Sequence, residues 1–519
     1  MPTSKPAKHT LTRRSFLQLS TSALAVSSLP LLTGCTASPL LCNPRVRRSI
    51  NGILDTSLEA RFALNHLGKL PIWTRTFEGS IPGPTLRVRP GDTLRVKLKN
   101  RLPMNHDEHP MDINTPHHFN SINLHTHGFH VSPTGNSDNV FIELEPGNDI
   151  DLQFDIPADH PAGTYWYHPH KHGAVALHLV SGMAGAIIIE GDIDEVPEIA
   201  AAKEQVIVMN EIRVVPNADD IPDGGGGHHH KADEETDCSI FDFVNGVPED
   251  YGLIDGAPIV RTVNGQVNPI VVMRPGEVQR WRLLNAGMAQ YLPLQLEEHE
   301  LHVIAHDGIT VAAPESVDSV LLAPGMRADV LVKAGKRGVY VLKKLEFDQG
   351  RGPVAETDML TLIVRGEALD MPLPETLPVP TSLPAIADEE IVRRRNLTFN
   401  VVPVDGQPVP DFLIDGNKFD PNRVDHTMTL DSAEEWTVSN FSAEYHPFHI
   451  HTNPFLVTRV NGAPLAIPVW RDTVDLEPNG NVTFRTRFAD FTGQFVLHCH
   501  IVDHEDFGMM QLLEVIAPQ

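Results

Sequence analysis

The chain of 519 residues is too long to fold around one hydrophobic core, and it predicts about three domains. Its 67 acidic residues exceed its 41 basic residues, and the net charge of -26 argues against nucleic acid as a partner. The 4 cysteines form no Cys-X-X-Cys pair, so a structural zinc site is not expected.

The N-terminal segment has the features of an export signal. Residues 12–17, Thr-Arg-Arg-Ser-Phe-Leu, form a twin-arginine pattern, and a modestly apolar stretch continues to Leu32. This stretch is broken by Pro30 and rich in Ser and Thr, so a transmembrane helix is not expected. Residues 32–35, Leu-Thr-Gly-Cys, are similar to a bacterial lipoprotein box in which Cys35 is acylated; ordinary cleavage nearby is the alternative. We expect residues 1–35 to direct the chain to the periplasm or cell envelope.

A weak internal repeat follows. Two strands of alternating apolar and polar residues, joined by a Gly or Ser turn, recur at 85–100, 270–285 and 428–440. Each copy closes on an apolar strand, at 185–190, 360–365 and 511–516. A period of about 170 residues predicts three related domains and not a solenoid. Short strands with frequent Gly and Pro predict all-β sandwiches. The expected domains are 50–192, 203–368 and 391–519, with a Pro-rich linker at 369–390.

Two His-X-His pairs lie in the first expected domain, His125 with His127 and His168 with His170. Alternate residues of an extended strand point to the same face, so each pair places two imidazoles together. Neutral imidazole is a usual ligand of copper. One such pair alone would indicate no more than polar histidines.

The second expected domain has no such pair and holds a low-complexity insertion at 224–235. Four glycines there precede His228, His229 and His230, which predicts a solvated loop. A copper-collecting arm is the alternative, because these imidazoles and nearby carboxylates suit divalent metals. A further His-rich stretch at 105–118 is expected to be a surface loop. A disulfide between Cys42 and Cys238 is left open by the sequence.

The third expected domain carries the most specific pattern. His498-Cys499-His500 is followed by His504 and Met509. If residues 495–501 form a strand, Cys499 faces one side and its two neighbours face the other, so one strand can join two metal centres. Upstream, His446 has the opposite parity to His449 and His451 and can point toward Cys499. A thiolate, two imidazoles and a weak thioether are the ligands of a blue-copper site.

With these four motifs, residues 50–519 resemble the multicopper oxidase family in its three-domain, laccase-like branch. The resemblance implies three cupredoxin-like Greek-key domains that hold four copper ions. It implies that the type 1 copper is held by His446, Cys499, His504 and Met509. It implies that the type 2 copper is held by His125 and His449. It implies that the two type 3 coppers are held by His127, His168, His170, His451, His498 and His500.

The resemblance also implies the reaction. Single electrons from a reductant reach the type 1 copper and pass along Cys499 to the other three coppers, where four electrons reduce dioxygen to two waters. Glu505 resembles the family's proton-relay acid, and Asp138 resembles the acid near the type 2 copper; ordinary turn or surface carboxylates are the alternative. Met509 as axial ligand predicts a low-to-moderate potential. We expect a monomer.

The sequence leaves the reductant open. Oxidation of phenols and aromatic amines is the leading expectation. Oxidation of Cu(I), or of Fe(II) or Mn(II), is the alternative, and the acidic charge, the His-rich loop and the segment at 504–510 favour it. The 13 methionines are scattered without a Met-rich insertion, which argues against Cu(I). A copper-binding protein without turnover is a third reading, which any oxygen consumption would exclude.

Overall fold

The computed structural model describes residues 39–105, 110–214, 258–407 and 409–518. Residues 36–519 form one compact unit, to which every element below belongs. The expected signal at 1–35 with Cys35, the His-rich loop at 224–235 and Cys238 lie outside the described residues. Among the described helices, none is long and apolar enough to cross a membrane.

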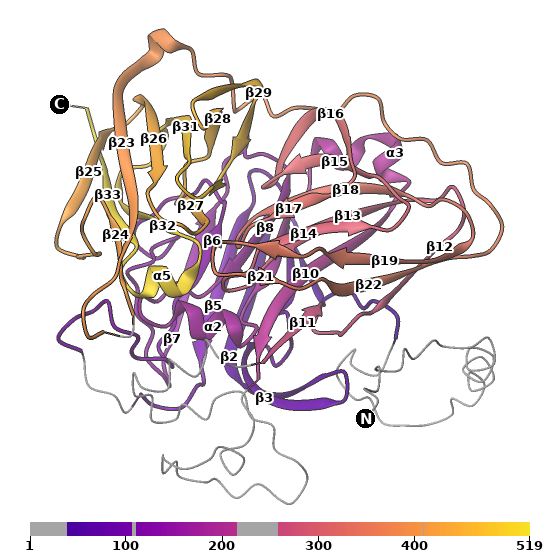
Figure 1. The fold of residues 1–519 in the computed structure, drawn as a ribbon, viewed down its shortest axis with the longest axis horizontal. Coiled ribbons are helices and arrows are strands. Elements are labelled where there is room, and N and C mark those ends of the chain that lie inside the picture. Colours follow the sequence, from indigo (N-terminus) through magenta and orange to yellow (C-terminus); the bar gives the residue numbers. More distant parts are fainter. Residues whose placement is uncertain (1–38, 106–109, 215–257, 408, 519) are drawn as a thin grey trace, which may run out of the picture. The chain divides into compact units, whose positions relative to one another are not determined.

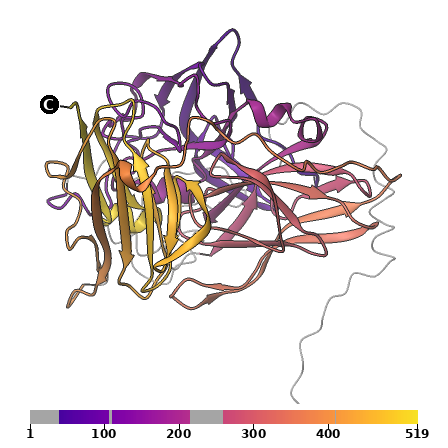
Figure 2. The ribbon, with the colours of Figure 1, turned by 90° about the horizontal axis from the view of Figure 1, so that it is seen from above.

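Within the described residues the strands form three pairs of sheets, here called the first, second and third repeats, and one two-stranded sheet (Figures 1 and 2). The first repeat contains, in spatial order, β3 (Leu70–Phe77), β2 (Ile53–Leu67), β5 (Thr93–Asn100) and β7 (Asp149–Asp155), and β1 (Val46–Arg48), β4 (Thr85–Val88), β9 (Gly185–Ile189), β8 (Gly163–His168) and β6 (His125–His127).

The second repeat contains β11 (Ile259–Val263), β10 (Lys203–Arg213), β13 (Val278–Asn285), β18 (Arg327–Lys333), β15 (Leu301–His306) and β16 (Ile309–Val317), and β12 (Ile270–Met273), β22 (Thr357–Val364), β19 (Gly338–Lys344), β14 (Leu292–Leu296) and β17 (Val320–Leu322). The two-stranded sheet joins β20 (Phe347–Asp348) to β21 (Pro353–Val354).

The third repeat contains β24 (Asp411–Ile414), β23 (Ile391–Val402), β26 (Ala433–Asn440), β31 (Asn481–Arg487), β28 (Phe455–Val460) and β29 (Ala463–Arg471), and β25 (Val424–Thr429), β33 (Met510–Ile516), β32 (Gly493–Cys499), β27 (His446–Ile450) and β30 (Thr473–Leu476). The short helices are α2 (Val175–Val180), η2 (Asp192–Glu195), α3 (Pro197–Ala200), η5 (Asp388–Glu390) and α5 (Val502–Asp506).

The internal repeat of the sequence is visible in the strand pairing. The two strands of each repeated stretch enter different sheets. The first of them pairs in parallel with the closing apolar strand of its repeat, as β4 with β9, β12 with β22 and β25 with β33. The second pairs in parallel with an earlier strand, as β5 with β2, β13 with β10 and β26 with β23. This shared topology confirms the predicted all-β, cupredoxin-like fold.

Alternation along the strands explains why they pack as sandwiches. In β5, Leu94, Val96 and Leu98 are buried and the residues between them are less so. In β13 every residue is buried, because its polar face also packs inside the protein. There Arg280 and Arg282 pair with the buried Asp329 at 2.6 and 2.9 Å. Buried charges of this kind are stable only when paired.

The strand predicted at 495–501 begins and ends two residues earlier, as β32 at Gly493–Cys499. β32 ends at Cys499, and α5 begins at Val502. The main chain turns here because the amide of Cys499 bonds the carbonyl of Met509, and the amide of Met509 bonds the carbonyl of His504, at 3.0 and 2.9 Å. These tertiary hydrogen bonds bring the residues that follow α5 back to the end of β32.

Candidate metal centre

One cluster forms around the thiol of Cys499 at the end of β32. β27 is the neighbouring strand and supplies His446, whose Nδ1 lies 3.4 Å from Cys499 Sγ. α5 supplies His504, whose Nδ1 lies 3.8 Å from the same sulfur and 3.2 Å from Nδ1 of His446. These side chains and Met509 are fully buried, and the main chain of Met509 bonds both Cys499 and His504. The structure thus brings together His446, Cys499 and His504 of the expected type 1 set, with the main chain of Met509 bonded beside them.

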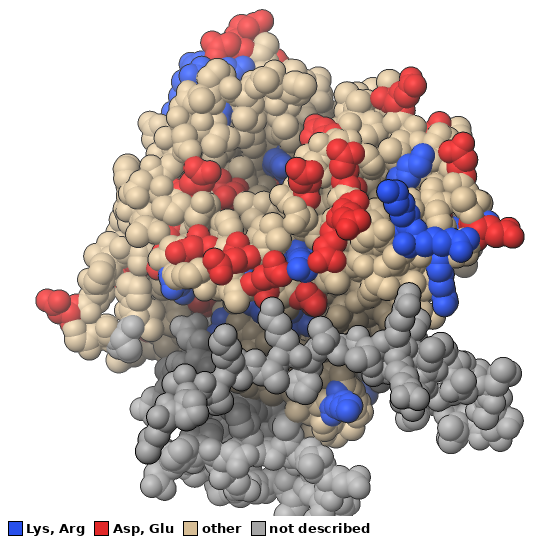
Figure 3. All heavy atoms as spheres, turned by 45° about the vertical axis from the view of Figure 1, so that its right-hand side comes forward, with Lys and Arg blue, Asp and Glu red and all other residues tan. Residues whose placement is uncertain are grey.

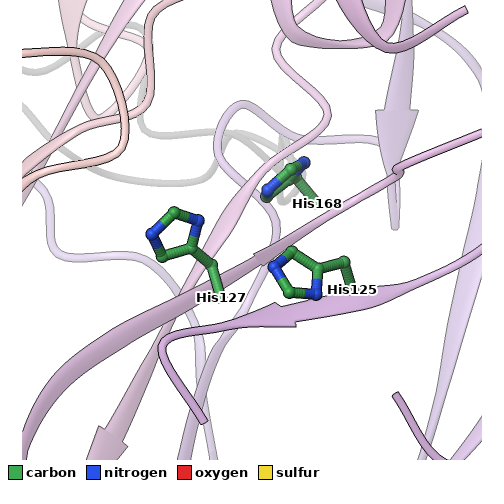
Figure 4. Close-up of side chains that lie close together, drawn as sticks. All are labelled: His125, His127 and His168. Atoms are coloured by element: carbon green, nitrogen blue, oxygen red, sulfur yellow. The ribbon is translucent and has the colours of Figure 1, made fainter. Parts of the chain in front are cut away.

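A second cluster gathers the eight histidines of the four His-X-His pairs. Strand register aligns them, because His125 faces His168 across β6 and β8, and His449 faces His498 across β27 and β32. Figure 4 shows His125, His127 and His168 around a common space, and ligand atoms of these three lie within 4.8 Å of one another. His449 of β27 stacks on His127 with ring centroids 3.8 Å apart, and His451, which follows β27, stacks on His125 at 3.9 Å.

The same cluster contains the rings that flank Cys499. Nε2 of His498 lies 3.2 Å from Nε2 of His170 and 3.3 Å from Nε2 of His451. On the other side, the ring centroid of His500 lies 4.9 Å from that of His127 and 5.7 Å from that of His168. Cys499 therefore belongs to one cluster, and the residues on either side of it belong to the other.

Several buried ring nitrogens in this cluster have no hydrogen-bond partner among the described residues. They are Nε2 of His125, His168 and His449, Nδ1 of His127 and His451, and both nitrogens of His500. A buried polar atom without a partner requires an explanation, such as a bound ion. Imidazole nitrogens that converge in this way suit copper, so the donor set fits the metal expected from the sequence.

Burial also keeps the rings in the form that binds metal. Desolvation lowers the pKa of the buried imidazoles, to about 3 for His168 and well below the ordinary value for His125, His446 and His504. Desolvation raises the pKa of the Cys499 thiol. A cation in the cluster would offset this by stabilising the thiolate.

The two acids expected from the sequence both touch the histidine cluster. Both carboxylate oxygens of the buried Asp138 lie 3.0 Å from Nδ1 of His125, and burial raises the pKa of this carboxyl to about 7. The carboxylate of Glu505 is also fully buried and lies between two rings, 3.3 Å from Nδ1 of His170 and 3.0 Å from Nδ1 of His498. Each acid can therefore orient an imidazole through Nδ1, which would leave Nε2 of that ring for a metal ion.

Sequence reasoning missed a third acid in the same cluster. Asp472 lies just before β30, and its Oδ1 is 3.2 Å from Nε2 of His127, while its carbonyl is 2.7 Å from Nδ1 of His449. Arg327 on β18 holds this carboxylate with bonds of 2.8 and 2.6 Å. Burial raises the pKa of Asp472 to about 6 despite the adjacent guanidinium. No spacing in the sequence marks Asp472 or Arg327, because neither is part of a His motif and the packing of the repeats brings both to the cluster.

The second repeat contributes none of the copper ligands expected from the sequence, yet Arg351 from its β20–β21 hairpin contacts the Cys499 cluster. Nη2 of Arg351 lies 2.7 Å from Nε2 of His504. The other imidazole of this cluster, His446, is held at Nε2 by Ser442 Oγ at 2.8 Å.

Acidic side chains gather in a band on the face of the protein in Figure 3, in keeping with the net charge of -26.

Comparison with known proteins identifies the same family along most of the chain. Three family models, each described as multicopper oxidase, match residues 63–193, 226–365 and 393–518. The multicopper oxidase mco of Staphylococcus aureus is 26% identical over 85% of this chain and 84% of that protein. A laccase of Bacillus stratosphericus is 26% identical over 92% of this chain and 97% of that protein.

A solved structure has the same fold. The multicopper oxidase of Campylobacter jejuni, described as a metallo-oxidase, superimposes with a TM-score of 0.73. It is 24% identical to this chain, and the match covers 93% of this chain and 96% of that one.

Proposed function

Because the chain belongs to the multicopper oxidase family and is a copper-dependent oxidoreductase that uses dioxygen, we propose that its reductants are phenols and aromatic amines. Four phenols would each lose one electron and one proton, and the four electrons and four protons would convert one dioxygen into two waters. The position of Cys499, whose two neighbours in the chain lie in the other cluster, carries the proposal of electron transfer to dioxygen, and the likeness to a laccase supports an organic reductant.

We propose four copper ions. His446, Cys499, His504 and Met509 would hold the type 1 ion, and His125 with His449 the type 2 ion. His127, His168 and His500 would hold one type 3 ion, and His170, His451 and His498 the other. Bound copper supplies reversible one-electron redox chemistry at the first cluster and multi-electron chemistry toward dioxygen at the second. The eight histidines form one continuous cluster, so metal analysis and spectroscopy must test how they are divided among the type 2 and type 3 ions.

The chain's own residues organise the reaction. Single peptide bonds join Cys499 to His498 and His500, which gives a short covalent path between the clusters. Burial of both clusters excludes bulk water. Asp138 and Glu505 contact ligand rings from the side away from the metal, which supports roles for both carboxylates in orienting those rings and in moving protons to the reduced oxygen.

The proposal is tested by oxygen uptake of the copper-loaded protein with a methoxyphenol and with chelated Cu(I). A higher kcat/KM for the phenol supports the proposal, and a much higher value for Cu(I) would replace it with a metal-ion oxidase. Acidic residues near the Cys499 cluster, including Glu444, favour that second candidate. Absence of oxygen uptake with both reductants would contradict oxidase turnover, and Cys499→Ser is the matched inactive control.

We also propose export of the folded protein to the periplasm or cell envelope as a monomer, with a lipid on Cys35. The twin-arginine pattern and lipoprotein-like box support this proposal. Replacement of Arg13 and Arg14 by Lys should leave the protein in the cytoplasm, and mass spectrometry of the mature chain should show its first residue and any lipid. Light scattering should give the mass of one chain.

A further inference from the structure

The Cys499 cluster comes close to solvent at Nε2 of His504. This ring is fully buried, yet the Arg351 side chain that contacts it through Nη2 at 2.7 Å is 43% exposed. At the other imidazole, Nε2 of His446 contacts Ser442, which is buried. One partly exposed side chain, Arg351, therefore separates His504 from solvent. An electron donor can approach the Cys499 cluster closely at this place.

The backbone around Arg351 is fixed in place. The carbonyl of Gln349 accepts a hydrogen bond from the amide of Tyr445 at 2.9 Å, and the side chain of Gln349 bonds to the second repeat. Gly350 packs so tightly that a Cβ atom there would clash with the carbonyl oxygen of Ala443. Nε of Arg351 donates to Glu444 at 2.6 Å. These contacts anchor the main chain of the hairpin to the second and third repeats, and only the side chain of Arg351 extends from it to His504.

The contact between Arg351 and His504 requires Nε2 of the ring to accept a hydrogen bond, because a guanidinium only donates. When Nδ1 of a neutral histidine binds a metal, its proton is on Nε2, so the ring becomes a donor at this position. With copper bound at Nδ1, two donors would face one another, and Nη2 would have to move away from Nε2. Nε2–H of His504 and an N–H of the Arg351 guanidinium would then be adjacent donors for one oxygen-rich ligand.

We propose that Arg351 and His504 Nε2 together recognise phenols that carry a carboxylate, and that the guanidinium disfavours bare metal cations. This inference rests on the proposed function. The phenol oxygen would accept from His504 and the carboxylate from Arg351, whose planar fork suits carboxylates. Glu444 keeps its bond to Nε and holds the guanidinium at the site, and Asp348 accepts from the hairpin amides of Gly350 and Gly352. One electron passes to the protein, and the phenolic proton passes to solvent.

The test compares 4-hydroxy-3,5-dimethoxybenzoate with neutral 2,6-dimethoxyphenol in copper-loaded wild type, Arg351→Gln and Arg351→Lys. We expect Arg351→Gln to lower the kcat/KM ratio of acid to phenol by about tenfold, since a hydrogen bond to a charged group is lost. Arg351→Lys should retain part of the ratio, and Arg351→Gln should raise kcat/KM for Fe(II) supplied as the hydrated cation. Arg394→Gln, at an exposed ion pair elsewhere, is the matched control.

Binding gives a readout that does not depend on turnover. Calorimetry with benzoate, which is not oxidised, should show about tenfold weaker binding to copper-loaded Arg351→Gln than to wild type. The blue absorption band should persist in each variant, which shows that the Cys499 cluster is intact. An unchanged substrate ratio or unchanged benzoate affinity would overturn the inference. Absence of oxygen uptake by wild type with both phenols would instead overturn the proposed function, while the benzoate comparison would still decide the role of Arg351.

Discussion

Replacement of Arg327 by Met should strongly destabilise the copper-free protein, because this guanidinium links all three repeats. It donates to the carbonyl of Thr164 in the first repeat, to the carbonyls of Asp307 and Gly325 in the second, and to both oxygens of Asp472 in the third. The side chains of Arg327 and Asp472 are 0% and 5% exposed. Burial disfavours the charged form of Arg327, but the adjacent carboxylates raise its pKa above the ordinary value.

Removal of one partner of a buried ion pair costs about 3–5 kcal/mol. The carbonyls that lose their donor add about 1 kcal/mol each. With the three carbonyls of Thr164, Asp307 and Gly325, we therefore expect a loss of about 6–8 kcal/mol, measured as the shift in urea midpoint multiplied by the m value. The double variant Arg327→Met, Asp472→Asn should recover part of this loss, because the buried charge left by the first substitution is removed.

Arg394→Met is the matched control, since Arg394 pairs with Asp388 and Glu435 at the exposed surface, and we expect no measurable shift. The reasoning is refuted if Arg327→Met shifts the midpoint no more than this control. It is also refuted if the double variant shows only the sum of the two single losses.

Three further predictions concern single residues. Cys499→Ser should abolish the strong visible absorption of the copper-loaded protein, and a surviving blue band would contradict the type 1 assignment. Met509→Leu should raise the reduction potential of the blue site, because the axial thioether donor is lost; a redox titration that shows an unchanged or lower potential would exclude Met509 as axial ligand. Burial raises the pKa of Asp475 to about 7. Between about pH 4 and 7 the folded chain therefore holds a proton on Asp475 that the unfolded chain has released. The free energy of unfolding falls as the pH rises through this range. In copper-free Asp475→Asn the urea midpoint should therefore fall less over this pH range than in wild type, and equal falls would show that Asp475 does not keep its proton.

The fold and the two clusters follow from local patterns, which is why the sequence predicts them. Alternation marks the strands of each repeat, and strand parity places Cys499 opposite His498 and His500. The end of β32 at Cys499 was not predicted, because it depends on hydrogen bonds to residues that follow α5. The turn brings His504 back to the thiol, a contact that parity alone does not describe.

Arg327, Asp472 and Arg351 were also missed, for a related reason. Each acts across repeats, and Arg327 and Asp472 are 145 residues apart in the chain. A lone Arg or Asp on a strand resembles any other surface charge until the packing of the repeats is known. Only the structure shows that the second repeat contributes charged groups to both clusters.

The placement of Cys499 between His498 and His500 has a consequence for how the protein fails under stress. The path between the two clusters is set by bond lengths, so heating cannot lengthen it without breaking the chain. The eight-histidine cluster, in contrast, is shared between β6 and β8 of the first repeat and β27 and β32 of the third, and it depends on noncovalent packing between them. Loosening of that packing would separate the rings of the eight-histidine cluster, while the residues of the Cys499 cluster, which all belong to the third repeat, would stay together. A partly damaged molecule would then still accept an electron at the Cys499 cluster and lose its blue colour. It would no longer transfer that electron to dioxygen.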